Sequence, residues 1–134
     1  MNKLFLRTFL IIICIMCLGC SDDSSLRAKE FRRNAYTGKN MQPDEWLIKS
    51  FQSARLFNTF GGINAIVENC FNEAKRNQGL KEINIISIKQ KNKITLIETE
   101  VVFNNNTKST GIDAWIKENG KWKMTPEEGN NDKD

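Results

Sequence analysis

Apolar residues follow different patterns along the chain, and each pattern predicts a different element. Residues 9–18 are continuously apolar, whereas residues 21–42 are mostly polar. Over 43–60, and again over 63–77, apolar residues recur every three or four positions, which predicts two amphipathic helices. Gly61-Gly62 lies between them, where glycine commonly ends a helix.

After Gly79 the apolar residues recur at every second position, which is typical of strands. We expect four strands, at 83–88, 94–103, 108–117 and 122–124. Asparagine-containing turns separate them, and Asn119-Gly120 is a strong hairpin signal because both residues accept positive φ. The predicted fold class is therefore α+β over residues 43–125, with two N-terminal helices packed on a curved four-stranded antiparallel meander sheet.

Residues 1–19 have the parts of a secretory signal: a basic start, an apolar run and a small residue, Gly19. The run is too short to span a bilayer, which needs about 20 apolar residues. Its end, Leu18-Gly19-Cys20, resembles a bacterial lipobox, whose cysteine is acylated and becomes the new N-terminus. The resemblance implies cleavage between Gly19 and Cys20 and lipid attachment at Cys20. An ordinary signal or an uncleaved anchor, in which Cys20 has no role, is the alternative.

The residues after the anchor suggest where the protein resides. Ser21 rather than aspartate follows Cys20, which in enteric lipoproteins implies transport to the outer membrane. We therefore expect a lipid-anchored envelope protein, with the periplasmic face of the outer membrane favoured over the inner membrane. Residues 20–42 are expected to be a flexible tether, in which a short helix near 26–35 remains open, and residues 126–134 a disordered tail. The basic residues of the tether are either solvated or near anionic headgroups: Arg27, Lys29, Arg32 and Arg33.

The last hairpin, with the sequence WIKENGKWKM at 115–124, and the order of the elements resemble a known family. They are similar to small bacterial lipoproteins with a nuclear-transport-factor-2-like, or cystatin-like, cone, in which an N-terminal helix packs into a curved sheet. The resemblance implies a fold and not an activity, because this fold carries many functions. Trp115 and Trp122 are expected to pair across the turn, and they are the candidate binding surface.

The residue inventory disfavours enzymatic chemistry in a chain of 134 residues, the length of one domain. Histidine is absent, and the single tyrosine, Tyr36, falls in the expected tether, so the usual acid–base pairs are missing. Asp113 could act as a lone base inside the cone, but its alternation predicts the surface. The enzyme hypothesis would revive only if Asp113, Glu98 or Glu100 proved to be buried within a cleft. We therefore expect no catalytic residues, no metal site and no cofactor.

The four cysteines do not predict a disulfide. Cys14 and Cys17 leave with the leader, and acylation uses Cys20. Cys70 lies on an apolar helical face, which favours core packing over a reactive thiol. The sequence has no basic stripe with interleaved aromatic residues, so we expect no nucleic-acid partner.

These patterns favour a membrane-anchored lipoprotein with a small non-enzymatic binding domain in the cell envelope. Its partner would be an envelope protein or a small apolar ligand. The alternative is an accessory or modulator of an envelope machine, for secretion or conjugation, exclusion or immunity, that acts by protein contact. A ligand binder should hold an apolar cavity of a few hundred Å³, whereas an interaction module should have a filled cone and an exposed apolar patch or edge strand.

Overall fold

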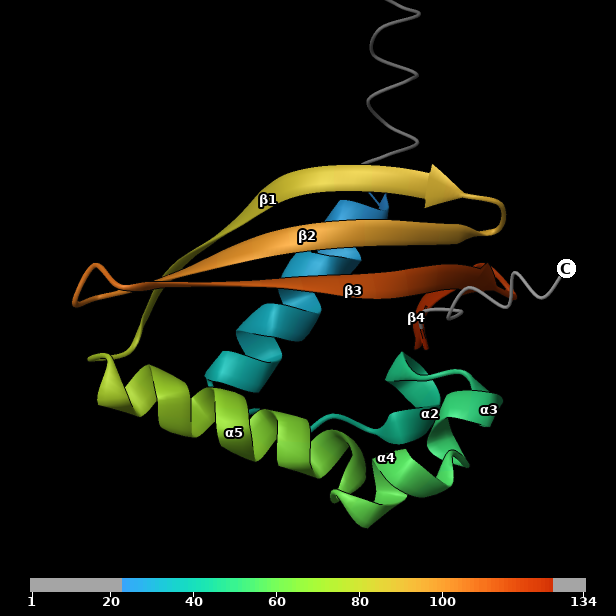
Figure 1. Ribbon diagram of the computed structural model, residues 1–134, viewed down its shortest axis with the longest axis horizontal. Coiled ribbons are helices and arrows are strands. Elements are labelled where there is room, and N and C mark those ends of the chain that lie inside the picture. The colour runs from blue at the N-terminus through green and yellow to red at the C-terminus, as the bar shows by residue number, and fades with distance from the viewer. Residues whose placement is uncertain (1–22, 127–134) are drawn as a thin grey trace, which may run out of the picture.

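A four-stranded antiparallel sheet forms one layer of the protein, and helices pack against one of its faces (Figure 1). The computed structural model describes residues 23–126, so the leader, Cys20 and most of the expected tail lie outside the described residues. The strands pair in chain order, β1-β2-β3-β4, with bounds Leu80–Lys91, Ile94–Phe103, Lys108–Glu118 and Lys121–Thr125. The predicted α+β class and the antiparallel meander are confirmed.

The turns between the strands use asparagines in the left-handed backbone region. Asn92, Asn106 and Asn119 have φ values of 56°, 67° and 51°, and Gly120 follows at 78°. Asparagine tolerates this region better than most residues other than glycine. Because Asn119 and Gly120 are both left-handed, they match the tight hairpin turn that the sequence predicts between β3 and β4.

The first expected helix is replaced by three short ones: α2, Pro43–Trp46; α3, Lys49–Gln52; and α4, Arg55–Thr59. Leu47 and Ile48 between the first two are extended, with ψ values of 143° and 156°. Leu47 forms a bridge to Met124, and the Ile48 N–H donates to the Met124 carbonyl at 3.1 Å. One helix over 43–60 was therefore a wrong prediction, because this backbone pairs with the edge of β4.

The second expected helix is present as α5, Gly62–Arg76. It begins after Gly61, which has a φ of 96° in the left-handed region. Ile63 and Ala74 on its apolar face are buried in the core. The glycine boundaries in the sequence therefore mark this helix correctly.

The segment expected to be a tether is part of the fold. Residues 23–36 form a helix, the unlabelled blue ribbon of Figure 1, which crosses the inner face of the sheet. Ala28, Phe31 and Ala35 are at most 1% exposed, and their spacing places them on one face. The flexible tether was therefore wrong wherever the structure describes it, because this narrow apolar stripe is enough to bury the helix. The folded domain therefore includes residues 23–42, which were expected to precede it.

The core lies between this helix and the sheet. The Phe31 ring contacts Trp46 at 5.6 Å and Trp115 at 5.8 Å between centroids, the latter edge to face. Such tilted arrangements are the favoured aromatic contacts. Leu47 and Ile97 are also fully buried. Side chains of the helix therefore fill the space over the inner face of the sheet.

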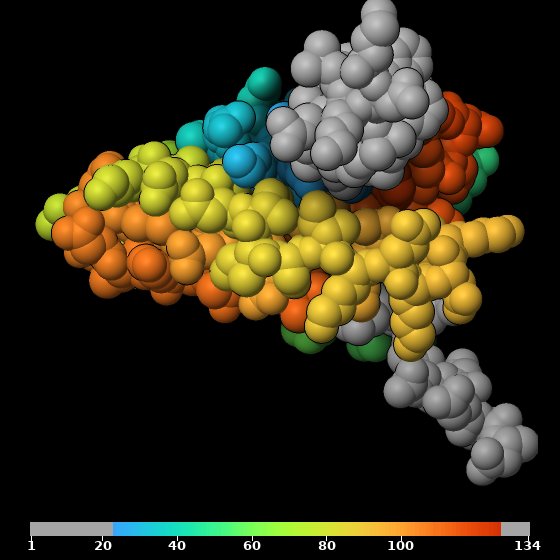
Figure 2. Space-filling model, turned by 90° about the horizontal axis from the view of Figure 1, so that it is seen from above, coloured from blue at the N-terminus to red at the C-terminus, as the bar shows by residue number. Residues whose placement is uncertain are grey.

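The two edges of the sheet differ. Leu47 and Ile48 cover part of the β4 edge, whereas no backbone hydrogen bond from another described element reaches the outer side of β1. Figure 2 shows the side chains of β1, in yellow, projecting from this edge. The β1 strand has an irregular register between Ile85 and Ser87 and carries a lysine at position 89. Bulges and lysines at an edge discourage pairing with other chains.

Candidate functional site

An open hollow of about 320 Å³ lies between the start of the helix 23–36 and the β3–β4 hairpin. Trp122 and the exposed Leu26 contribute apolar surface to it. Its charged lining residues are three acids and three bases: Asp23, Glu30, Glu45, Arg27, Lys117 and Lys121. The hollow therefore has a mixed lining that is balanced in charge, and it is open to solvent, unlike the enclosed apolar cavity expected of a binder of apolar ligands.

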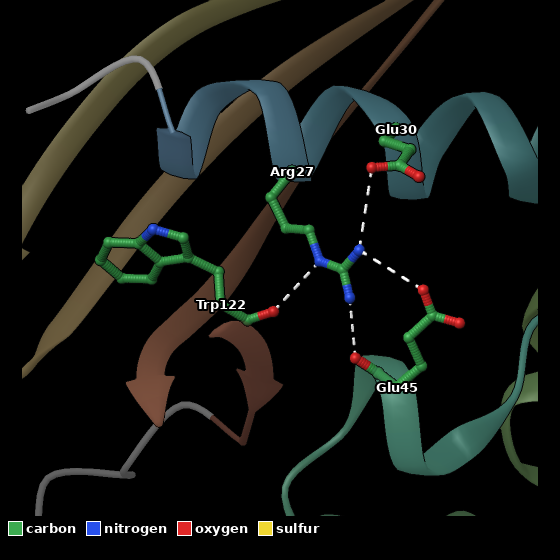
Figure 3. A network of polar contacts seen from close by, with 4 residues as sticks. All are labelled: Arg27, Glu30, Glu45 and Trp122. Carbon is green, nitrogen blue, oxygen red and sulfur yellow. Dashed lines mark hydrogen bonds and ion pairs between the residues drawn. The ribbon is translucent and has the colours of Figure 1, made fainter. Parts of the chain in front are cut away.

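Arg27 fixes the geometry of this hollow (Figure 3). Its Nε donates to the Trp122 carbonyl at 3.2 Å, and its Nη2 donates to the Glu45 carbonyl at 2.7 Å. Its guanidinium carbon lies 3.5 Å from the centre of the Trp46 ring, a cation–π contact. Arg27 therefore connects the helix 23–36, α2 and β4, and its charge is already engaged.

The carboxylates beside Arg27 stay close to solvent. Oε2 of Glu30 and Oε1 of Glu45 lie 3.7 Å and 3.9 Å from Nη1 of Arg27, and both side chains are about half exposed. These separations are too long for hydrogen bonds, so the carboxylate oxygens can still accept them. On the hairpin, Lys117 and Lys121 form no ion pair within residues 23–126.

A second polar group lies inside the domain. Nη2 of Arg32 is 2.6 Å from Oδ2 of Asp113, and both side chains are 14% exposed. The two groups are not aligned as a hydrogen bond, and neither Arg32 Nε nor Asp113 Oδ2 has a hydrogen-bond partner among the described residues. Gly111 makes room for the guanidinium, because a Cβ there would lie 2.7 Å from Nη2.

The expected surface position of Asp113 was therefore wrong. Asp113 pairs across the sheet with Ile97, which is fully buried on the inner face. Burial raises the pKa of the Asp113 carboxyl, and the neighbouring Arg32 opposes part of that rise. The pair brings two charges into the domain, which costs solvation that their attraction only partly offsets.

Tyr36, at the end of the helix 23–36, and Cys70, on α5, lie close together. The Tyr36 hydroxyl donates to Oε2 of Glu73 at 3.4 Å, and its ring lies 5.6 Å from that of Phe103. Cys70 is partly buried and packs against the apolar clusters, in agreement with the expected core role. Burial raises the pKa of its thiol, which keeps it protonated and a weak nucleophile at neutral pH.

Tyr36 offers a direct test of this burial because it is the only tyrosine of the chain. Burial, helped by Cys70 and Glu73, raises its pKa from 10.0 to about 12. The folded state then holds the proton more tightly, so this contribution to stability is complete below pH 10 and is lost toward pH 12. We expect the ultraviolet absorbance of tyrosinate to titrate near pH 12 in the folded chain and near 10 in denaturant. Tyr36→Phe is the control, and equal pKa values in both states would contradict the burial.

The two tryptophans of the candidate binding surface have different positions. Trp115 is 0% exposed beneath Phe31, so it offers no surface to a partner, and that part of the prediction was wrong. The register pairs Trp115 with Met124 and Trp122 with Lys117, so the two indoles do not face each other directly. Trp122 is partly buried and lines the hollow.

Glu98 and Glu100 lie on the other face of β2 from Ile97. Oε2 of Glu98 accepts a hydrogen bond from Ser87, and Glu100 forms an ion pair with Lys108 at 3.8 Å. Neither glutamate lines the hollow. The spacing of Ala28, Phe31 and Ala35 was the signal that could have placed the neighbouring arginines in the fold.

Two further classes of feature are absent from residues 23–126. No group of three or more histidine, cysteine, aspartate or glutamate side chains in that range is placed to hold a metal ion. No helix of the described part is long and apolar enough to cross a membrane.

Comparison with known proteins supports the fold. No protein-family model matches the chain, and no curated protein matches it. A solved structure from Campylobacter jejuni, which carries the provisional name NTF2-like transpeptidase, matches with a TM-score of 0.61 and 25% sequence identity. The match covers 72% of this chain and 92% of that chain. The domain therefore has the nuclear-transport-factor-2-like, or NTF2-like, fold that the resemblance implies.

Proposed function

We propose that this chain is a lipoprotein anchored through Cys20 at the periplasmic face of the outer membrane, and that its domain acts by binding at its surface. The leader and the Leu18-Gly19-Cys20 motif support the anchor. Several acyl chains hold a protein durably on a bilayer, whereas one does not.

The filled interior is the observation that carries the binding mode. A cone that takes up an apolar ligand needs empty space over its sheet. Here Phe31 and Trp115 occupy that space and are at most 1% exposed. The accessible chemistry is at the surface, in the charged hollow beside residue 23.

The chemistry of the polar residues supports a role without catalysis. The Campylobacter jejuni structure has transpeptidase in its name, and acyl transfer of that kind needs an activated nucleophile beside a base. This chain has no histidine, and burial raises the pKa of Cys70. Asp113, the remaining candidate base, lies against Arg32.

The alternative role, as an accessory or modulator of an envelope machine, draws support from one further feature. Leu56 on α4 and Phe60 just after it are 76% and 77% exposed, more than any other large apolar residue described. Exposed apolar side chains that lie together are typical of protein contact sites.

The anchor is tested by labelling cells with palmitate. The full chain should incorporate the label and sediment with outer membranes, and Cys20→Ala should lose both properties. Cys14→Ala is the matched control, since Cys14 belongs to the leader but lies outside the four residues of the motif that ends at Cys20, and it should leave labelling unchanged. An unlabelled wild-type chain, or a Cys20→Ala chain that keeps the label, would overturn the anchor at Cys20. Labelled protein found wholly in the inner membrane would overturn the outer-membrane location.

A further inference from the structure

The charged hollow lies where a lipid on Cys20 would bring it to the membrane surface. Asp23 lines the hollow and is three residues from Cys20. Three extended residues span at most about 11 Å. If Cys20 is acylated, as proposed above, the hollow therefore lies at the level of the phospholipid headgroups.

The walls of the hollow carry both signs of charge on different elements. The acids Glu30 and Glu45 come from the helices, and the bases Lys117 and Lys121 come from the β3–β4 hairpin. The two carboxylates have acceptor capacity left, since their ion pairs to Arg27 are 3.7 Å and 3.9 Å long. An ammonium group supplies three donors to such oxygens, and lysine ammonium groups donate to phosphate oxygens.

The apolar residues of the hollow also suit a membrane surface. Leu26 is 64% exposed at the rim, and Trp122 contributes the apolar part of its ring, since its Nε1 is buried. Tryptophan favours the boundary between headgroups and acyl chains. The hollow therefore presents polar groups for a headgroup and apolar groups for the start of its acyl chains.

We propose that this hollow binds an ammonium–phosphate zwitterion, the headgroup of phosphatidylethanolamine, when the domain is held on the membrane by the lipid at Cys20. The ammonium binds Glu30 and Glu45, and the phosphate binds Lys117 and Lys121. A glycerol headgroup lacks the cation for the carboxylates, and a choline headgroup lacks N–H donors. The site therefore discriminates in favour of ethanolamine.

The site is tested by titrating the full chain in detergent with glycerophosphoethanolamine and following tryptophan fluorescence. Trp122 is the tryptophan that lines the hollow, whereas Trp46 and Trp115 are at most 2% exposed, so Trp122→Phe should remove most of the signal. We expect glycerophosphoethanolamine to bind saturably. The affinity for glycerophosphocholine, glycerophosphoglycerol and inorganic phosphate should be at least tenfold lower. Equal binding of inorganic phosphate, or no saturation, would overturn the proposal.

Variants test the two halves of the site separately. Glu30→Gln and Lys121→Gln should each weaken binding of glycerophosphoethanolamine about tenfold or more. Their matched controls are Glu68→Gln on α5 and Lys93→Gln in the β1–β2 turn, both exposed and outside the hollow, and these should bind as the wild type does. Unchanged affinity in both hollow variants would overturn the assignment of its residues.

Vesicles distinguish a lipid headgroup from a soluble zwitterion. The full chain is reconstituted with phosphatidylglycerol plus either phosphatidylethanolamine or phosphatidylcholine, and Trp122 emission should shift only with the ethanolamine lipid. Binding of the soluble headgroup without that shift would overturn the membrane ligand. The wild-type chain separates this proposal from the anchor: palmitate labelling without headgroup binding overturns the headgroup site alone, whereas headgroup binding by an unlabelled wild type supports the site and overturns the anchor. Cys20→Ala should bind the soluble headgroup as the wild type does.

Discussion

Replacing Phe31 by alanine is expected to lower the free energy of unfolding by about 3–5 kcal/mol. The ring is 1% exposed and lies between Trp46 and Trp115, so its removal leaves a cavity where the N-terminal helix, α2 and β3 meet. Domains of ordinary stability have only about 5–15 kcal/mol in total. The Phe31→Ala variant should therefore populate unfolded molecules at temperatures that leave the wild type folded.

Urea unfolding followed by circular dichroism measures this loss. Leu26→Ala is the matched control, because Leu26 is on the same helix but is 64% exposed, and it should change the free energy by about 0.5 kcal/mol or less. If both variants unfold at the urea concentration of the wild type, the helix 23–36 does not belong to the core.

Replacing Asp113 by alanine is expected to destabilise the domain by about 3–5 kcal/mol. The carboxyl group is the close partner of Arg32, at 2.6 Å, and alanine leaves a gap and a guanidinium 14% exposed with no acceptor beside it, whereas a protonated carboxyl still offers its carbonyl oxygen. The double variant Arg32→Met with Asp113→Leu should lose less than Asp113→Ala alone, because no uncompensated charge stays buried. Equal loss in the single and double variants would mean that packing, and not charge, sets the effect.

The Asp113 carboxyl makes the free energy of unfolding depend on pH. Because burial raises the pKa of Asp113, the folded chain binds its proton more tightly than the unfolded chain, in which the pKa is about 3.9. Its contribution to stability is therefore complete below that value and is lost as pH rises through the folded-state pKa. Asp113→Asn should remove this decline, whereas Asp44→Asn, at an exposed position, should keep it. If the free energy of unfolding of the wild type rises relative to that of Asp113→Asn as pH increases, the pKa of Asp113 is not raised.

The sheet and α5 were predictable because local signals agree with the tertiary structure there. Alternating apolar residues predict the strands, and Asn92, Asn106 and Asn119 mark the turns through their tolerance of positive φ. The split of residues 43–60 was not predictable in this way. The apolar spacing continues through Leu47, and only pairing with Met124, far along the chain, makes that backbone extended.

The short helix that the sequence leaves open near 26–35 is present, but its place in the core and the hollow beside it were missed for a related reason. Only a narrow stripe of this helix is apolar, so its composition resembles that of a linker, although Ala28, Phe31 and Ala35 are buried. The hollow gathers residues from two helices and the last hairpin, and no short motif shows that Arg27 and Trp122 meet. Without the three-dimensional fold, the sequence could identify only Trp122 of its lining residues as a candidate.

The contact between Arg27 and the Trp122 carbonyl joins residues that are 95 positions apart. The helix 23–36 thus completes its contacts only when the last strand is available, although its contacts with α2 can form earlier, and contacts of such long range slow folding. A chain that emerges with its N-terminus first therefore leaves the sheet-facing side of this helix uncovered until nearly all of the domain is present. This late closure suits a protein proposed to act beyond a membrane, because its own topology delays the native state.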